Sequence, residues 1–187
     1  MLPLLLLPYL SGGLSSELDD WLARGEVSVF ELKDDGHLKQ VTNITDLPAP
    51  VDAVWAKLID FEAWPTWMTQ VDEVQVVARD GDALDVRWNI AVVGPAVTFT
   101  GRYTLDTAKR TITGEWLDGQ LKGSFWSWRL EPHGAQTRLY RTSFTNAVTD
   151  NWLLRQLDDE AHTMEYGINA ATGFLEVRAL KRALGGV

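Results

Sequence analysis

The sequence predicts an α+β fold in which a curved antiparallel sheet is wrapped around one long C-terminal helix. Apolar and polar residues alternate with a period of two from Val71 to Val148, a pattern typical of antiparallel strands with one buried face. Apolar residues then recur with the helical period from about Thr149 to Leu184, which indicates a long helix. Two short helical segments marked by prolines precede the alternation. One helix laid across a curved sheet cannot fill its concave face, so a cavity is expected there.

The chain of 187 residues, of which 45% are hydrophobic, fits one domain of ordinary size. We expect that domain to cover residues 14–187, because the sequence shows no internal repeat or linker. Residues 1–13 contain an apolar run that is too short to span a bilayer. The run resembles part of a signal peptide but lacks a basic flank. A truncated export signal and an apolar tail packed on the domain both stay open, as does a cytoplasmic or exported location.

The formal net charge of −9 argues against several classes of partner. An acidic surface repels phosphate backbones and anionic lipid headgroups, so we expect no nucleic-acid partner and only transient membrane contact. The absence of cysteine excludes disulfides, thiolate nucleophiles and cysteine-based metal sites. The oligomeric state stays open.

The first elements are a helix and a hairpin. A helix is expected over 15–22, where a serine can cap its start and Gly25 follows its end. Strands over 26–32 and 38–47 flank the turn at 33–36, which has the composition of a hairpin turn.

Two small helices should follow these strands. Pro50 suits the first position of a helix, and apolar residues repeat at helical spacing as far as Leu58. A second piece covers 61–68, where Pro65 removes a helical donor and keeps the segment irregular.

The alternating region should form an antiparallel meander that leads into the long helix. Its strands are expected at 71–78, 84–92, 97–105, 112–116, 121–131 and 138–148. The apolar stripe of the helix is expected to consist of Leu153, Leu157, Ala161, Met164, Ile168, Ala171 and Leu175.

The segment 49–67 carries a motif that resembles a known family. It combines a proline, Val-Trp, Leu-x-Asp and aromatic-Pro-x-aromatic, at Pro50, Val54, Trp55, Leu58, Asp60, Trp64, Pro65 and Trp67. This pattern is similar to that of START-like proteins, the polyketide cyclase/dehydrase and lipid transport superfamily, and most similar to its coenzyme-Q-binding and polyketide-cyclase-like branch. The resemblance covers about residues 26–180 and implies the helix-grip fold. The proline usual two residues after the motif is replaced by Thr69.

The resemblance favours a hydrophobic-ligand cavity on the concave face, lined by aromatic residues and by small ones that leave room. The candidate ligand-binding residues are Trp67, Trp88, Phe99, Gly101, Tyr103, Gly114, Trp116, Trp126, Trp128, Tyr140, Thr142, Phe144, Met164, Gly167, Ile168 and Ala171. The alternative is that the aromatic residues simply fill the core. The small residues from Gly167 to Gly173 would either leave space under the helix or allow close helix–sheet contact. Trp67 fits a gate at the cavity mouth, whereas Trp55 fits a structural anchor.

Catalytic and metal-binding signals are weak. His162 lies among acidic residues, but a solvated acidic face explains that cluster better than a metal site. Arg87, Arg102 and Arg129 should face outward. The predicted inward positions carry no ionisable group except tyrosine, so we assign no catalytic residue, metal or cofactor.

The sequence therefore favours a non-enzymatic binder or carrier of a small lipid-, quinone- or polyketide-like molecule. Tyr103, Tyr140, Thr142 or Asn146 would orient the ligand by hydrogen bonds. The alternative is an enzyme of the polyketide cyclase/dehydratase type that uses the same cavity. A third possibility is a domain that assists another protein's folding, which a large exposed apolar patch would favour.

Overall fold

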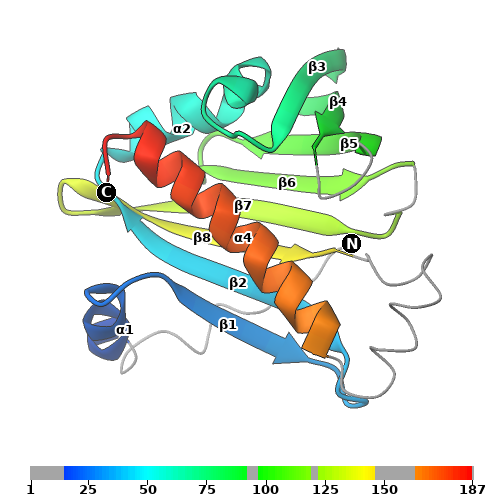
Figure 1. Cartoon of the computed structure of the whole chain (residues 1–187). Coiled ribbons are helices and arrows are strands. Elements are labelled where there is room, and N and C mark those ends of the chain that lie inside the picture. Colours follow the sequence, from blue (N-terminus) through cyan, green and yellow to red (C-terminus); the bar gives the residue numbers. More distant parts are fainter. Residues whose placement is uncertain (1–14, 92–96, 119–121, 146–162, 187) are drawn as a thin grey trace.

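The computed structural model describes residues 15–91, 97–118, 122–145 and 163–186. These residues form an eight-stranded antiparallel sheet with strand order β1-β2-β8-β7-β6-β5-β4-β3, and the C-terminal helix lies across it (Figure 1). The elements are α1 (Ser15–Leu22), β1 (Val27–Leu32), β2 (Leu38–Leu47), α2 (Val51–Ile59), η2 (Phe61–Thr66), β3 (Val71–Asp80), β4 (Ala83–Ile90), β5 (Val97–Asp106), β6 (Thr111–Trp116), β7 (Phe125–His133), β8 (Gln136–Phe144) and α4 (Thr163–Ala183). The predicted α+β, helix-grip architecture is confirmed.

The element boundaries agree with the sequence pattern to within a few residues. Strand β3 runs two residues further than expected, and Gly81 then turns the chain with a positive φ of 57°, a conformation that glycine adopts without strain. The expected start of the long helix near Thr149 lies outside the described residues. The same holds for Asn146, for His162 and the acidic residues just before it, and for the first three members of the predicted stripe.

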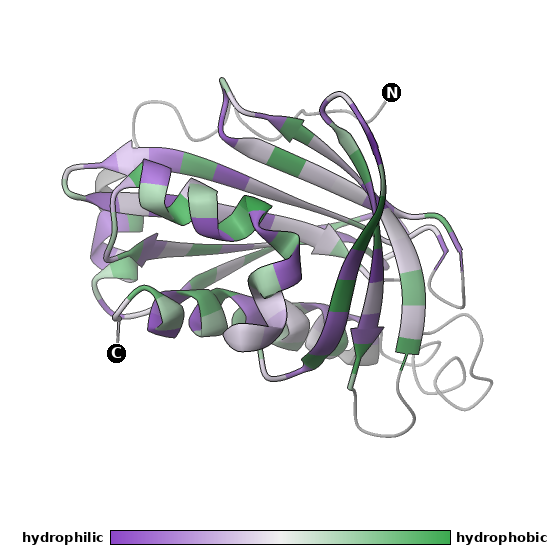
Figure 2. Ribbon diagram, turned by 90° about the horizontal axis from the view of Figure 1, so that it is seen from above, coloured by the Kyte–Doolittle hydropathy of each residue, from purple (hydrophilic) through white to green (hydrophobic). Residues whose placement is uncertain are grey.

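The helices cover different parts of the sheet. Helix α4 packs on β2 and β8, α2 packs on β7 and β8, and η2 packs on β3. Figure 2 shows hydrophobic and hydrophilic residues alternating along the strands beneath them. Helix α1 packs on β2, where Arg138 forms ion pairs with Asp19 of the helix and Asp46 of the strand, each at 2.8 Å. No helix in the described ranges is both long and apolar enough to cross a membrane.

The family-like motif forms the compact corner made by α2 and η2. Val54, Trp55 and Leu58 are the buried residues of α2, and Trp64 is buried in η2. The indole N–H of Trp64 donates a 3.1 Å hydrogen bond to the carbonyl of Leu58. Pro65 falls inside a 3-10 helix, which accounts for the irregular piece that the proline predicts.

The face predicted for β8 is wrong. Arg141 pairs with Trp128 and Ser143 pairs with Trp126 across the β7–β8 ladder, and directly opposed residues share a face. The predicted ligand residues Tyr140, Thr142 and Phe144 therefore lie on the opposite face. There, Arg129 stacks on the Tyr140 ring at 3.8 Å, and Thr142 hydrogen-bonds Thr42 at 2.9 Å. The alternation pattern predicts that the aromatic residues of β8 face inward, because it does not anticipate an arginine on the inner face.

The apolar stripe predicted for the long helix is also wrong over the described residues. Ala171 is exposed and Leu175 is 49% exposed. The buried side is instead formed by Glu165, Asn169, Gly173, Val177 and Leu180. Polar residues replace apolar ones at the start of this face because they satisfy backbone groups at the end of the sheet, as described below.

Candidate ligand-binding site

Five of the predicted ligand residues form one aromatic cluster on the concave face. They come from neighbouring strands and are Trp88, Phe99, Tyr103, Trp116 and Trp126. Phe99 stacks on Trp116 with 3.6 Å between ring centroids, and on Trp88 at 6.3 Å. Tyr103 lies 5.1 Å from Trp126 and 6.0 Å from Trp88. The pairing of strands β4 to β7 therefore brings these five side chains together, and they form the aromatic wall that the alternation in the sequence predicts.

Helix η2 covers one side of this cluster. Trp64 packs edge-on against Trp88 at 5.0 Å and against Trp128 at 5.7 Å. Trp67 lies 4.8 Å from Trp64 and is half-buried, with the Lys57 ammonium 5.7 Å from its ring. Trp67 thus lies one ring away from the concave wall, and its role as a gate stays a prediction.

The two strand glycines do not leave empty space beside them. A Cβ on Gly101 would lie 3.1 Å from the Trp126 ring, and a Cβ on Gly114 would lie 2.8 Å from it. Tyr103 lies 3.2 Å and 3.0 Å from the same two positions. Room for a ligand was predicted here, but the Trp126 indole fills it.

A buried polar cluster lies under α4, which contradicts the prediction that tyrosine is the only ionisable residue type on this face. The Arg141 guanidinium, with only 3% of its side chain exposed, binds both carboxylate oxygens of Glu176, one of them at 2.8 Å. It also donates a hydrogen bond to Ser143. Arg141 was missed because its face was misassigned: the aromatic residues of β8 lie on the opposite face of this mostly polar strand.

Tyr103 is the ionisable group inside the aromatic cluster. Burial raises the pKa of the Tyr103 hydroxyl well above its usual value, and the negative charge of Glu176 adds to this. The N–H groups of Trp88 and Trp126 lie close enough to lower that pKa partly. Among the described residues, however, the buried Nε1 of Trp88 has no hydrogen-bond partner of good geometry. The cluster therefore holds a neutral hydroxyl beside an unsatisfied donor.

The small residues of α4 serve different purposes. A Cβ on Gly173 would overlap the amide oxygen of Asn43 on β2, so this glycine allows close helix–sheet contact. Gly167 is exposed and has open space around it, and Ile168 is half-buried. The Met164 side chain lies outside the described residues.

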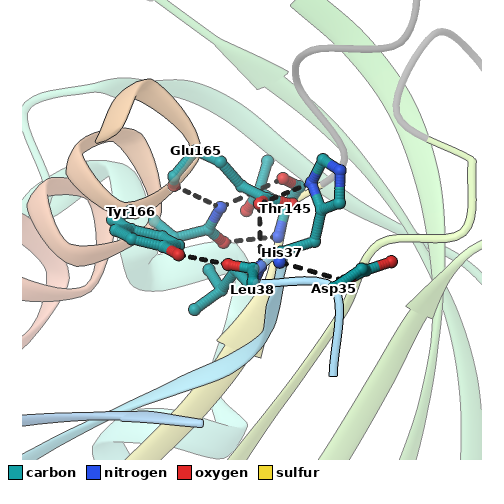
Figure 3. A network of polar contacts seen from close by, with 8 residues as sticks. Asp35, His37, Leu38, Thr145, Glu165 and Tyr166 are labelled. Atoms are coloured by element: carbon teal, nitrogen blue, oxygen red, sulfur yellow. Dashed lines mark hydrogen bonds and ion pairs between the residues drawn. The ribbon is translucent and has the colours of Figure 1, made fainter. Parts of the chain in front are cut away.

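Polar contacts fasten the start of α4 to the sheet (Figure 3). The Glu165 carboxylate accepts a 2.8 Å hydrogen bond from the backbone N–H of Leu38 and lies 3.4 Å from His37. Tyr166 donates to the carbonyl of Gly36. Asn169 accepts from the N–H of Thr145 at 2.6 Å and donates to its carbonyl at 3.2 Å. This polar clasp explains the polar residues on the buried side of the helix.

Arg102 lies on the convex face, as predicted. Its guanidinium binds both oxygens of Asp85 at 2.7 and 2.8 Å. A surface hollow of about 400 Å³ is lined by Gly25, Glu26 and three basic residues of α4, away from the aromatic cluster. No group of acidic, histidine or cysteine side chains within the described ranges is arranged to hold a metal ion.

Comparison with known structures shows the same fold in several proteins. The Zhui aromatase/cyclase from a Streptomyces species is 23% identical with a TM-score of 0.64, covering 81% of this chain and 100% of its own. A STAR-related lipid transfer protein from Xanthomonas axonopodis is 15% identical with a TM-score of 0.63, covering 86% and 93%. A START superfamily protein from Mycobacterium smegmatis is 17% identical with a TM-score of 0.60, covering 78% and 97%.

A search of curated protein sequences finds no match. The family model described as polyketide cyclase / dehydrase and lipid transport matches residues 47–163, which is more than half of the chain. The matched range starts just before the Pro50 motif and includes strands β4 to β7, which build the aromatic wall. The chain therefore belongs to the polyketide cyclase/dehydrase and lipid transport family.

Proposed function

We propose that this protein binds a small hydrophobic molecule on the concave face of the sheet, as a carrier or a sequestering protein. The observation that carries the proposal is the continuous aromatic cluster on that face, which ends in two half-buried indoles, Trp116 and Trp126. Proteins of the same fold include ones named for lipid transfer and for aromatase/cyclase activity, which supports a ligand of this chemical kind. We further propose that residues 14–187 act as one domain.

Apolar contact supplies the affinity in this proposal. Burying about 200 Å² of ligand surface against these rings contributes roughly 5 kcal/mol before the losses of motion on binding. The neutral Tyr103 hydroxyl and the Trp88 N–H provide polar contacts that orient the ligand. With a net charge of −9, exchange with anionic membranes would be transient, and nucleic acid would be repelled.

Native mass spectrometry of protein purified from its own cells tests this proposal. We expect a bound species that organic solvent releases and that Trp88→Phe reduces in occupancy, since this change removes the unsatisfied donor. Trp21→Phe serves as the matched control, because Trp21 is 49% exposed on α1 and lies outside the cluster. Ligand-free protein together with no binding of naphthol or decanoic acid would overturn the proposal.

A second candidate function is a cyclase/dehydratase-type enzyme, and the buried Arg141–Glu176 pair is the observation that favours it. A buried guanidinium can stabilise an enolate that develops on a ligand carbonyl, and a protonated tyrosine can donate a hydrogen bond to that oxygen. In this reading Arg141 stabilises charge and Tyr103 orients the carbonyl.

The two candidate functions differ in the molecule that the protein releases. A carrier returns the molecule that it bound, whereas a dehydratase returns one that is lighter by a molecule of water. The double variant Arg141→Met with Glu176→Leu should abolish that mass loss while retaining binding. A cyclisation without loss of water keeps the ligand mass, so an unchanged mass together with an unchanged chromatographic retention after prolonged incubation with the wild type would exclude the enzyme.

A further inference from the structure

Two glycines on neighbouring strands form a flat floor on the concave face. Gly101 pairs with Trp116, while Gly114 pairs with Tyr103 on one side and with Trp126 on the other, so the two glycines are diagonal neighbours. Different parts of the Trp126 indole lie above the two glycines. Cη2 and Cζ2 lie 3.1 and 3.4 Å from a Cβ placed on Gly101, and Cε2 and Nε1 lie 2.8 and 2.9 Å from one placed on Gly114. One indole therefore spans the whole floor.

Three aromatic rings stand around this floor and form the walls of a slot. They surround Trp126 with ring centroids at 5.1 Å for Tyr103, 5.8 Å for Trp116 and 6.4 Å for Phe99. Their planes are inclined to the indole plane by 66°, 88° and 88° respectively. This edge-to-face arrangement is the favourable geometry for a flat aromatic guest. The floor and walls together form a slot, which we call the glycine slot.

Trp126 is placed so that it can leave the slot, whereas its neighbour Trp128 is not. Trp126 is the second residue of β7 and is half-buried, so its indole has solvent to rotate into. Trp128, two residues further on, is 1% exposed and packs between Trp64 and the Arg141 guanidinium. A change of side-chain rotamer at Trp126 needs no movement of the strand.

A hydrogen-bond donor without an acceptor of good geometry lies beside two of these walls, 6.3 Å from Phe99 and 6.0 Å from Tyr103 between ring centroids. Trp88 is 3% exposed, and its Nε1 makes no hydrogen bond of good geometry within the described residues, although it lies near the Tyr103 hydroxyl. A buried donor without a good acceptor destabilises a protein. A guest with an acceptor oxygen would remove that penalty, whereas an unsubstituted hydrocarbon chain would not.

We propose that Trp126 occupies the ligand slot of its own protein, and that the ligand displaces it. The ligand is then a planar molecule of two or more fused aromatic rings that bears a carbonyl or phenolic oxygen. This inference rests on the proposed binding function and narrows its ligand class. A flexible fatty chain matches neither the flat floor nor the donor.

Calorimetry with naphthol as the probe tests the proposal on Trp126→Ala. We expect this variant to bind naphthol about tenfold or more tightly than the wild type, because no indole has to be expelled first. Adding Gly114→Val to Trp126→Ala should refill the slot and remove the gain. Phe125→Ala is the matched control, since this neighbouring aromatic lies on the opposite face of β7 and should leave affinity unchanged. Trp126→Ala should raise the affinity for decanoic acid less than the affinity for naphthol.

Equal naphthol affinity in the wild type and Trp126→Ala, or a gain that survives Gly114→Val, would overturn the proposal. If Trp126→Ala does not fold, the indole N–H resonance of Trp126 in NMR spectra of the wild type tests the proposal instead. It should shift on adding naphthol, and a fixed signal would overturn the slot. A ligand found by native mass spectrometry without any gain in Trp126→Ala would refute the slot alone. A gain in Trp126→Ala with a ligand-free wild type that binds neither probe would support the slot and overturn the binding function.

Discussion

The Tyr103 hydroxyl lies where water cannot stabilise its ionised form. Because burial raises its pKa in the folded protein, the unfolded chain loses this proton at a lower pH than the folded protein does. The folded state then holds more protons above about pH 10, so the free energy of unfolding falls as pH rises there. One such group lowers the free energy of unfolding by up to roughly 1.4 kcal/mol per pH unit.

Tyr103→Phe removes this ionisation. We expect the variant to lose less stability than the wild type between neutral pH and the alkaline range, as measured by urea denaturation at several pH values. Identical alkaline slopes in the two proteins would contradict the assignment of Tyr103 as a buried neutral hydroxyl.

The buried Arg141–Glu176 pair gives a second prediction at this scale. Glu176→Gln leaves a buried guanidinium without its counter-charge, which we expect to lower the free energy of unfolding by about 3–5 kcal/mol. Replacing both residues, as Arg141→Met with Glu176→Leu, should restore most of that loss. The exposed pair of Arg102 and Asp85 is the control, and Arg102→Met should change stability by less than about 1 kcal/mol. A double variant as unstable as the single one would contradict this account.

At the scale of elements, two glycines of α4 provide a matched pair. Gly173 lies against Asn43 of β2, whereas Gly167 faces open space. Gly167→Ala should stabilise the protein by about 1 kcal/mol, because alanine is the better helix former. Gly173→Ala gains the same propensity but forces the helix away from the sheet, so we expect a net loss in thermal denaturation. Equal effects at the two positions would show that α4 does not pack closely on β2.

The elements also show where sequence reasoning succeeds. Strict alternation predicts β4 to β7 and their aromatic inner face, because each inward position there is apolar or glycine. It fails on β8, where Arg141 points inward and depends on Glu176, a residue 35 positions later in the chain. It fails on α4 because Glu165 and Asn169 are buried by hydrogen bonds to the sheet. Periodicity detects apolar burial and does not detect polar burial that is satisfied by a distant partner.

For the whole molecule, the architecture and the family follow from the Pro50 motif and the two periodicities. The space available to a ligand does not. The glycines at 101 and 114 indicate room, but whether that room is empty depends on the conformation of one side chain from the next strand, Trp126. The same fold also serves proteins named for different activities, so ligand identity depends on the residues of the site.

The nine tryptophans allow the central claim to be tested directly. With the tryptophans fluorine-labelled, fluorine NMR can follow each indole during titration with naphthol and, separately, with decanoic acid. Binding on the concave face predicts saturable shifts for Trp88, Trp116 and Trp126, with Trp21 on the exposed face of α1 unchanged. Shifts confined to Trp21, or no saturable shift at any tryptophan with either probe, would contradict ligand binding on the concave face of the sheet.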